Sequence, residues 1–216
     1  MKKNFAIFDM DGTLADSVEF WKDVGREYLL QRGLTEDLQE VLGNTRGMRM
    51  SESAAFFIEK FSLADTQAEV EAAMNAIMDG HYRNDISLKP GVREYLQKLA
   101  AQGVRMCVAS TSDEKLIALC LSRLQVAEYF EFILSCETVG AGKKRPDVFL
   151  EAARRLGAAP SEIAVYEDMY DALETAACAG FYTIGVYEEA MKNDWERIQK
   201  LADEVVWGWS RASQEL

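Results

Sequence analysis

The chain has 216 residues, of which 49% are hydrophobic and 28% charged, a composition typical of a globular protein with one domain and an insert, or with two unequal domains. Its formal net charge of -12 repels nucleic acid and anionic membranes, so neither is expected as a partner. Asp9 interrupts the N-terminal apolar run before it could form a signal-peptide core, and no later run reaches the roughly 18 apolar residues of a membrane span, so we expect a cytoplasmic protein.

The first apolar run, Phe5–Phe8, lacks polar alternation and predicts a strand buried on both faces of a sheet. Asp9 and Asp11 follow it in the stretch "DMDGT", where their charges repel each other. A calcium-binding EF-hand would need Gly and Glu where the chain has Leu14 and Phe20, and the glycine spacing of a Rossmann or P-loop phosphate cradle is missing. There remains a carboxylate cluster in which a divalent cation offsets the repulsion and one group is free for proton transfer.

Residues 15–86 carry helical patterns and no convincing strand, which predicts a helical domain inserted after the first strand. A capping box, Thr66-x-x-Glu69, predicts the start of one of its helices. The remaining residues, 1–14 and 87–216, are expected to form the core domain. The single histidine, His81, lies late in the insert, so a hydrolase built on Ser, His and Asp would have to use it, and a carboxylate mechanism is favoured.

Beyond the insert, strand-like and helical patterns alternate. Further strands are expected at Val104–Ala109, Phe132–Leu134 and Ile163–Tyr166, with fainter ones at Tyr182–Val186 and Val205–Trp207. Helices are expected after Pro90, after Pro146 and over Met169–Ala179. This order predicts an α/β fold, a Rossmann-like doubly wound parallel sheet that binds ligands at the carboxyl ends of its strands. The polar residues 210–216 at the C-terminus are expected to fray.

Polar residues stand at the ends of the later strands. These are Ser110 and Thr111 in "VAST", Lys143 in "GKKRPDVF", and Glu167 and Asp168 in "VYEDMYDA". Together with "DMDGTLADS", these stretches closely resemble the four motifs of the haloacid dehalogenase-like superfamily, the first of which reads DxDGTxxDS. The third stretch departs from the family's usual Gly-Lys-Pro-x-Pro-Asp, because Lys144 stands where the first proline is expected. Lys143 is therefore the preferred phosphate-binding lysine, and Lys144 is the alternative.

The resemblance implies a phosphoric monoester hydrolase that uses Mg²⁺ and acts on a small phosphorylated metabolite. In the family, the residue at Asp9 attacks phosphorus to form an aspartyl-phosphate, and the residue at Asp11 protonates the leaving oxygen and then activates water. Ser110 and Lys143 would bind the phosphate. The implied metal ligands are Asp9, the backbone carbonyl of Asp11, Asp168 and, through a water, Glu167. Independently of any family, a nucleophile must be ionised while a general acid holds a proton, so the two carboxyl groups need different environments.

The helical insert resembles the family's cap of the first type, which closes over the active site and selects the substrate. Candidate substrate contacts are Trp21, Arg46 and Arg49 in the insert and Thr111 in the core. An equally weighted alternative is that Trp21 belongs to the hydrophobic core of the insert and that both arginines are solvated.

Two other functions stay open. A phosphomutase of the β-phosphoglucomutase type is one, although such proteins usually carry a histidine in the first cap helix, where Trp21 aligns. The other is a protein that binds phosphate or metal without catalysis. Dehalogenases dispense with the second aspartate, so Asp11 argues against that chemistry. A monomer and a dimer are both compatible with the sequence.

Overall fold

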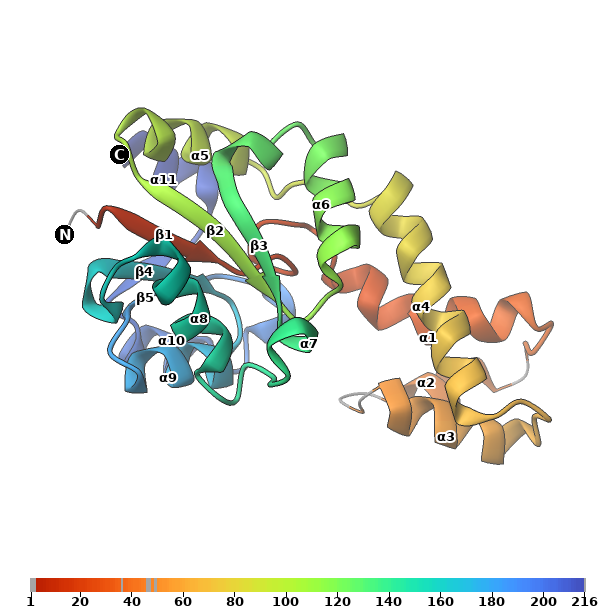
Figure 1. Cartoon of the computed structure of the whole chain (residues 1–216). Helices are drawn as coiled ribbons and strands as arrows, with labels where there is room; N and C mark the ends of the chain where they lie inside the picture. Colours follow the sequence, from red (N-terminus) through yellow and green to blue (C-terminus); the bar gives the residue numbers. More distant parts are fainter. Residues whose placement is uncertain (1–2, 36, 46–47, 49, 216) are drawn as a thin grey trace. The chain divides into compact units, whose positions relative to one another are not determined.

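Figure 1 shows the computed structural model, which describes residues 3–35, 37–45, 48 and 50–215. The chain divides into two compact units, which we call the core unit (Met1–Ser17 with Ile86–Leu216) and the helical unit (Val18–Asp85). The sequence places these boundaries after residues 14 and 86. Residues 15–17 and Ile86 fall in the core unit instead. The two connections pair there, since the amide of Asp16 donates to the carbonyl of Ser87 at 2.9 Å.

A six-stranded sheet forms the centre of the core unit. Its strands are β1 (Phe5–Phe8), β2 (Arg105–Ser110), β3 (Phe130–Ser135), β4 (Ile163–Glu167), β5 (Tyr182–Val186) and β6 (Glu204–Val206). They lie in the order β3-β2-β1-β4-β5-β6, and every neighbouring pair is parallel. Each of the six predicted apolar runs overlaps one strand, and the predicted Rossmann-like fold is confirmed. Since β1 lies between β2 and β4, the carboxyl ends of these three strands are neighbours.

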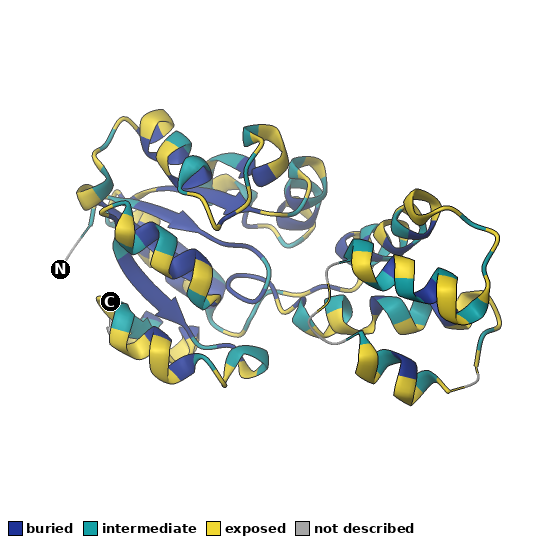
Figure 2. Ribbon diagram, turned by 90° about the horizontal axis from the view of Figure 1, so that it is seen from below, coloured by how far each residue is buried: buried dark blue, intermediate teal, exposed yellow. Residues whose placement is uncertain are grey.

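Helices cover both faces of the sheet (Figure 2). The core unit contains α5 (Val92–Ala101), α6 (Glu114–Arg123), α7 (Cys136–Val139), α8 (Asp147–Leu156), α9 (Tyr170–Cys178), α10 (Trp195–Leu201) and α11 (Trp209–Glu215), with 3-10 turns at Ala127–Tyr129, Pro160–Glu162 and Glu189–Met191. On one face, Ile7 of β1 lies in a buried cluster with Phe149 of α8 and Ala172 of α9. On the other, Phe8 packs near Trp209 of α11, with ring centroids 6.2 Å apart. Burial on both faces explains why the strands lack polar alternation.

The helical unit consists of α1 (Val18–Gln31), α2 (Leu38–Asn44), α3 (Met50–Phe61) and α4 (Gln67–Asn84). The predicted capping box is confirmed at the start of α4, where the Thr66 hydroxyl accepts from the Glu69 amide at 3.3 Å and the Glu69 carboxylate accepts from the Thr66 amide at 2.7 Å. Tyr28 and Phe57 stack in the core of the unit, with ring centroids 6.1 Å apart. Within the described ranges, none of the helices of the chain has both the length and the apolar character required to cross a bilayer.

Two chain segments connect the units, and they pair with each other inside the core unit. Besides the bond from Asp16 to Ser87, the amide of Lys89 donates to the carbonyl of Leu14 at 2.9 Å, and Ala15 forms an antiparallel bridge with Leu88. The Lys89 ammonium also donates to the carbonyl of Gly12 at 2.5 Å. The returning connection is thus bonded to the loop that carries the two aspartates.

The C-terminal segment is helical, so the expectation that residues 210–216 fray is wrong for the described residues up to 215. Trp209 begins α11, is 2% exposed and packs edge-on against Tyr95 of α5, with ring centroids 4.8 Å apart. Its indole nitrogen donates to the carbonyl of Thr13 at 3.0 Å. Burial of this one large ring holds the short helix in place. The polar composition of the segment gives no indication of this contact.

The close approach of α11 to the start of α5 requires glycine at position 91. The φ angle of Gly91 is +92°, and a Cβ atom there would overlap the backbone nitrogen of Ser210. Gly103 has a similar φ of +79°, but no atom lies within 4 Å of a Cβ built there. Gly91→Ala is therefore expected to reduce the free energy of unfolding by about 1 to 3 kcal/mol more than Gly103→Ala, which shares only the φ strain. Urea unfolding of both variants tests this, and equal losses would contradict it.

Candidate active site

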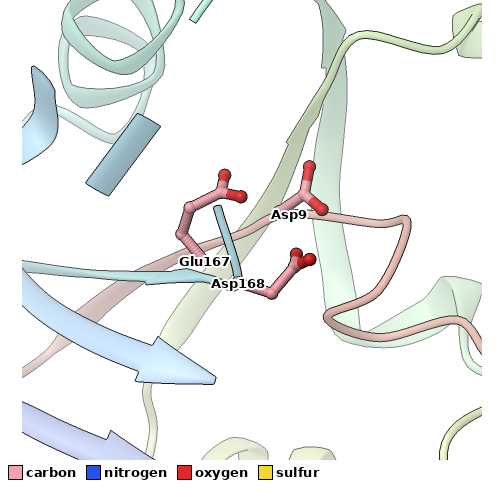
Figure 3. Close-up of side chains that lie close together, drawn as sticks. All are labelled: Asp9, Glu167 and Asp168. Carbon is pink, nitrogen blue, oxygen red and sulfur yellow. The ribbon is translucent and has the colours of Figure 1, made fainter. Parts of the chain in front are cut away.

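Three carboxylates meet where β1 and β4 end. Asp9 directly follows β1, Glu167 is the last residue of β4, and Asp168 is the next. The parallel register of the two strands places Asp9 opposite Glu167, and the Asp9 amide donates to the Tyr166 carbonyl at 3.0 Å. All three side chains are buried, and one oxygen from each lies within 4.8 Å of the others. Figure 3 shows the three carboxylate groups gathered at the ends of the two strands.

Lys143 supplies the positive charge in this cluster. From the loop before α8, its ammonium donates to Asp9 Oδ1 and, at 2.7 Å, to Glu167 Oε2. Burial alone would lower the pKa of Lys143, but the charges of Asp9 and Glu167 outweigh it and raise that pKa, so the ammonium stays protonated. The alternative lysine, Lys144, has a side chain that is 85% exposed and pairs with Asp171 at 3.2 Å. The structure thus brings Lys143 and not Lys144 to the carboxylates.

The carboxylates resist ionisation without a further cation. Burial and, second, the charge of Glu167 together raise the pKa of Asp168 to about 8, against the effect of a hydrogen bond from Thr13, which lowers it. The pKa of Asp9 is raised well above its usual range, first by burial and then by Glu167, although Lys143 lowers it. Three ionised carboxylates and one ammonium would leave two negative charges uncompensated in a buried space.

A divalent cation would balance this charge, so the residues present fit a metal site. Its ligands would be carboxylate oxygens, the donors that hard cations such as Mg²⁺ prefer. Of the four predicted ligands, the structure brings together Asp9, Glu167 and Asp168. The Asp11 side chain is not among them, and ligation through its backbone carbonyl stays a prediction. Glu167 accepts hydrogen bonds from Lys143 and, at 3.1 Å, from the Met169 amide.

The Asp11 carboxylate lies beside the cluster and is held by two serines. Ser17 donates to Oδ1 at 2.6 Å, and Ser112 donates to Oδ2 at 2.8 Å. The charge of Asp11 is the smallest of the causes that raise the pKa of Asp9, after burial, Glu167 and Asp168. Sequence reasoning assigned no role to either serine. A signal for Ser17 was present, because it is the final serine of the DxDGTxxDS pattern.

The two polar residues after β2 differ in burial. Ser110 is fully buried, and its hydroxyl oxygen accepts from the Ser112 amide at 3.1 Å. The Thr111 side chain is exposed. Their predicted roles, phosphate binding by Ser110 and substrate contact by Thr111, stay predictions.

The candidate contacts in the helical unit are only partly described. Trp21 of α1 is half-buried and packs edge-on against Tyr82 of α4, with ring centroids 6.5 Å apart, so it contributes to the core of that unit. Arg46 and Arg49 lie outside the described residues. Their proposed contact with substrate stays a prediction.

Thr13 is a site residue that sequence reasoning missed. Its buried hydroxyl donates to Asp168 Oδ1 at 2.9 Å, so the loop after β1 supports a carboxylate at the end of β4. The threonine is part of the DxDGT pattern, which could have drawn attention to it. Its partner across the sheet is 155 positions away in the sequence, and no local pattern predicts that contact.

Without divalent metal, the free energy of unfolding is expected to fall as pH rises from about 5 to 8. Between about pH 3.9, where an unfolded aspartate titrates, and about 8, the folded state holds a proton on Asp168 that the unfolded state has lost. The loss is at most about 1.4 kcal/mol per pH unit for this carboxyl group. Urea unfolding in EDTA at several pH values measures it, and Mg²⁺ should reduce the slope.

The control for this pH dependence is Asp168→Asn, because other groups titrate in the same window. Burial alone would lower the pKa of His81, but hydrogen bonds to Asp85 and Glu27 outweigh it and raise that pKa. Stability from His81 is therefore also lost as pH rises through its folded-state pKa. Only the part of the slope that disappears in Asp168→Asn belongs to Asp168. An unchanged slope in that variant would contradict the prediction.

Comparison with known proteins shows which family the chain resembles in sequence and in fold. The family model for haloacid dehalogenase-like hydrolases matches residues 6–186. Protein CbbY of Rhodobacter capsulatus is 29% identical over 208 residues, which cover 90% of this chain and 89% of that protein. The phosphorylated carbohydrates phosphatase of Thermotoga maritima is 26% identical over 180 residues, 82% of each chain. The crystal structure of CbbY from Rhodobacter sphaeroides in complex with phosphate superposes with a TM-score of 0.72 at 22% identity, covers 100% of both chains, and shares the fold.

Proposed function

The chain belongs to the haloacid dehalogenase-like hydrolases, as its four motifs indicate, and from this premise we propose that it is a magnesium-dependent phosphatase acting through an aspartyl-phosphate. The observation that supports this most directly is the buried group of Asp9, Glu167 and Asp168 with Lys143 bonded to two of them. The proposal is supported because these carboxylates could serve as nucleophile and metal ligands beside a buried lysine.

The proposed substrate is a monophosphate ester of a small metabolite. The relative from Thermotoga maritima is named for phosphorylated carbohydrates, which favours sugar phosphates among such esters. The net charge of -12 also favours this class over nucleic acid, because the field of the protein repels a polyanion, while a site that holds Lys143 and a divalent cation could still bind one phosphoryl group.

In the proposed first step, Asp9 attacks phosphorus as the bond to the leaving alcohol breaks, and Asp11 donates a proton to the departing oxygen. In the second, Asp11 takes a proton from water, the water oxygen attacks phosphorus, and the bond to Asp9 breaks to release inorganic phosphate. A bound divalent cation would neutralise charge on Asp9 and on a phosphoryl oxygen. Two different carboxyl groups thus perform the covalent and the proton-transfer chemistry.

The serines beside Asp11 are suited to both of its protonation states. A hydroxyl group can donate to a carboxylate and can also accept from a carboxylic acid. Ser17 and Ser112 can therefore keep Asp11 in one orientation while its proton leaves and returns. Lys143 holds Asp9 in place and adds a positive charge where negative charge develops on the phosphoryl group.

Hydrolysis of p-nitrophenyl phosphate with and without EDTA tests the proposal, followed by a panel of sugar, nucleotide and small-acid phosphates. Turnover is expected only with Mg²⁺, and beryllofluoride is expected to inhibit by occupying Asp9. Turnover that EDTA does not affect would contradict the proposal. Transfer of phosphate within a hexose 1-phosphate without release would identify a mutase. Failure to turn over any ester, together with a melting temperature raised by Mg²⁺, would identify a binding protein.

A further inference from the structure

A buried chain of hydrogen bonds runs from the C-terminal helix to the carboxylate cluster. The indole nitrogen of Trp209 donates to the Thr13 carbonyl at 3.0 Å, and the Thr13 hydroxyl donates to Asp168 Oδ1 at 2.9 Å. All three side chains are at most 2% exposed. Within the described residues, Asp168 Oδ2 accepts no hydrogen bond, so Thr13 fixes one oxygen of the carboxylate and leaves the other for a ligand.

Packing fixes the Trp209 ring independently of its hydrogen bond. The ring lies among Phe8, Tyr95 and Tyr166, with centroids at 6.2, 4.8 and 5.7 Å. Gly91 allows the backbone at Ser210 to approach, as described above. The indole N–H is thereby presented from a rigid aromatic cluster to the loop between β1 and the helical unit.

A hydrogen bond is not needed to bury a tryptophan in this protein. Trp195 is also buried, and its indole nitrogen has no hydrogen-bond partner among the described residues. Packing alone therefore accounts for a buried indole ring, and the bond from Trp209 to Thr13 has a separate effect. The bond acts on Thr13. It holds the backbone carbonyl of this residue, and the hydroxyl of the same residue donates to Asp168.

We propose that Trp209 is a positioning residue that sets the orientation of the Asp168 carboxylate for divalent-cation binding, acting through Thr13. The proposal rests on the proposed function only in taking the carboxylate cluster as the metal site. Partners that orient metal ligands typically change metal affinity by about 10- to 100-fold when removed. Trp209 acts one residue further away, so its loss should have a smaller effect of the same kind.

The test is Trp209→Phe, which keeps an aromatic ring and removes the N–H donor. Trp207→Phe is the matched control, because Trp207 lies two positions earlier and is 53% exposed. Mg²⁺ affinity of the full chain is measured by isothermal titration calorimetry, without substrate. The dissociation constant is expected to rise about 3- to 10-fold in Trp209→Phe, the effect of one lost neutral hydrogen bond, and to stay unchanged in Trp207→Phe.

Two Thr13 variants test the second bond of the chain. Thr13→Val removes the hydroxyl at nearly constant volume and should weaken Mg²⁺ binding by about 10-fold or more, while Thr13→Ser should retain most of the affinity. Adding Trp209→Phe to Thr13→Val should weaken binding no further. Full additivity of the two changes, or equal affinities of Trp209→Phe and Trp207→Phe, would overturn the proposal.

A measurement on the unaltered protein keeps the proposal testable if Trp209→Phe does not fold. The chain has four tryptophans, so its nitrogen-15 spectrum should contain four indole signals. The Trp209 signal is expected to shift on addition of Mg²⁺, and an unshifted signal would overturn the proposal. Absence of phosphatase activity would refute the proposed function alone, since both readouts measure metal binding.

Discussion

Asp9→Asn is expected to reduce turnover of p-nitrophenyl phosphate by about 10⁴-fold or more, because an amide cannot replace the carboxylate as the nucleophile. The same change removes one of the three buried carboxyl groups that crowd around Lys143 and resist ionisation together. In EDTA the variant should therefore unfold at an equal or higher temperature than the original protein, as expected where function requires an unfavourable buried charge. Steady-state kinetics and thermal unfolding in the same buffer measure both effects.

Asp171→Asn is the matched control for this substitution. Asp171 lies at the start of α9, close in sequence to Asp168, but its side chain is 54% exposed and pairs with exposed Lys144. The change should leave turnover within about twofold and stability within about 0.5 kcal/mol, as is usual for an exposed ion pair. If Asp9→Asn retained more than a few per cent of the activity, another group would have to be the nucleophile.

Lys143→Met is expected to reduce the free energy of unfolding in EDTA by about 3 to 5 kcal/mol at pH 7, because it leaves Asp9 and Glu167 buried without their cation. Turnover should fall by about 10²- to 10³-fold, the usual effect of removing one group that stabilises the transition state. Mg²⁺ should restore part of the stability and little of the activity. Urea unfolding with and without Mg²⁺ measures the first effect, and initial rates measure the second.

The adjacent residue provides the control. Lys144→Met makes the same type of substitution at a side chain that is 85% exposed, so the free energy of unfolding should change by no more than about 0.5 kcal/mol. Equal destabilisation by the two substitutions would show that the buried bonds of Lys143 do not stabilise the fold. A larger loss of activity from Lys144→Met would support the register alternative that the sequence leaves open.

The sequence predicts the sheet and the strand-end motifs because both depend on local patterns. The unbroken apolar run Phe5–Phe8 followed by "DMDGT" suffices to place Asp9 at the end of a buried strand. Helix α6 was not predicted, although its signals are present: Asp113 caps it through hydrogen bonds to the amides of Lys115 and Leu116, and Ile117 and Cys120 form its buried side.

Other features could not be read from local patterns. Which of Lys143 and Lys144 turns inward depends on where α8 begins and on which carboxylates lie across the sheet. The bond from Trp209 to Thr13 joins residues 196 positions apart, so only the folded core brings them together. Helix α11 has too few residues to be stable alone, and its formation depends on that tertiary contact.

The paired connections between the units have a consequence for how the protein can vary. Ala15 and Leu88 form a backbone bridge, so the chain leaves the core unit and re-enters it at nearly the same point. A short turn could rejoin the two segments, and an unrelated sequence could equally be grafted between them, with little change in the entropy of closing the chain. The junction therefore allows the helical unit to be exchanged without altering the backbone pairing that holds the loop of Asp9 and Asp11.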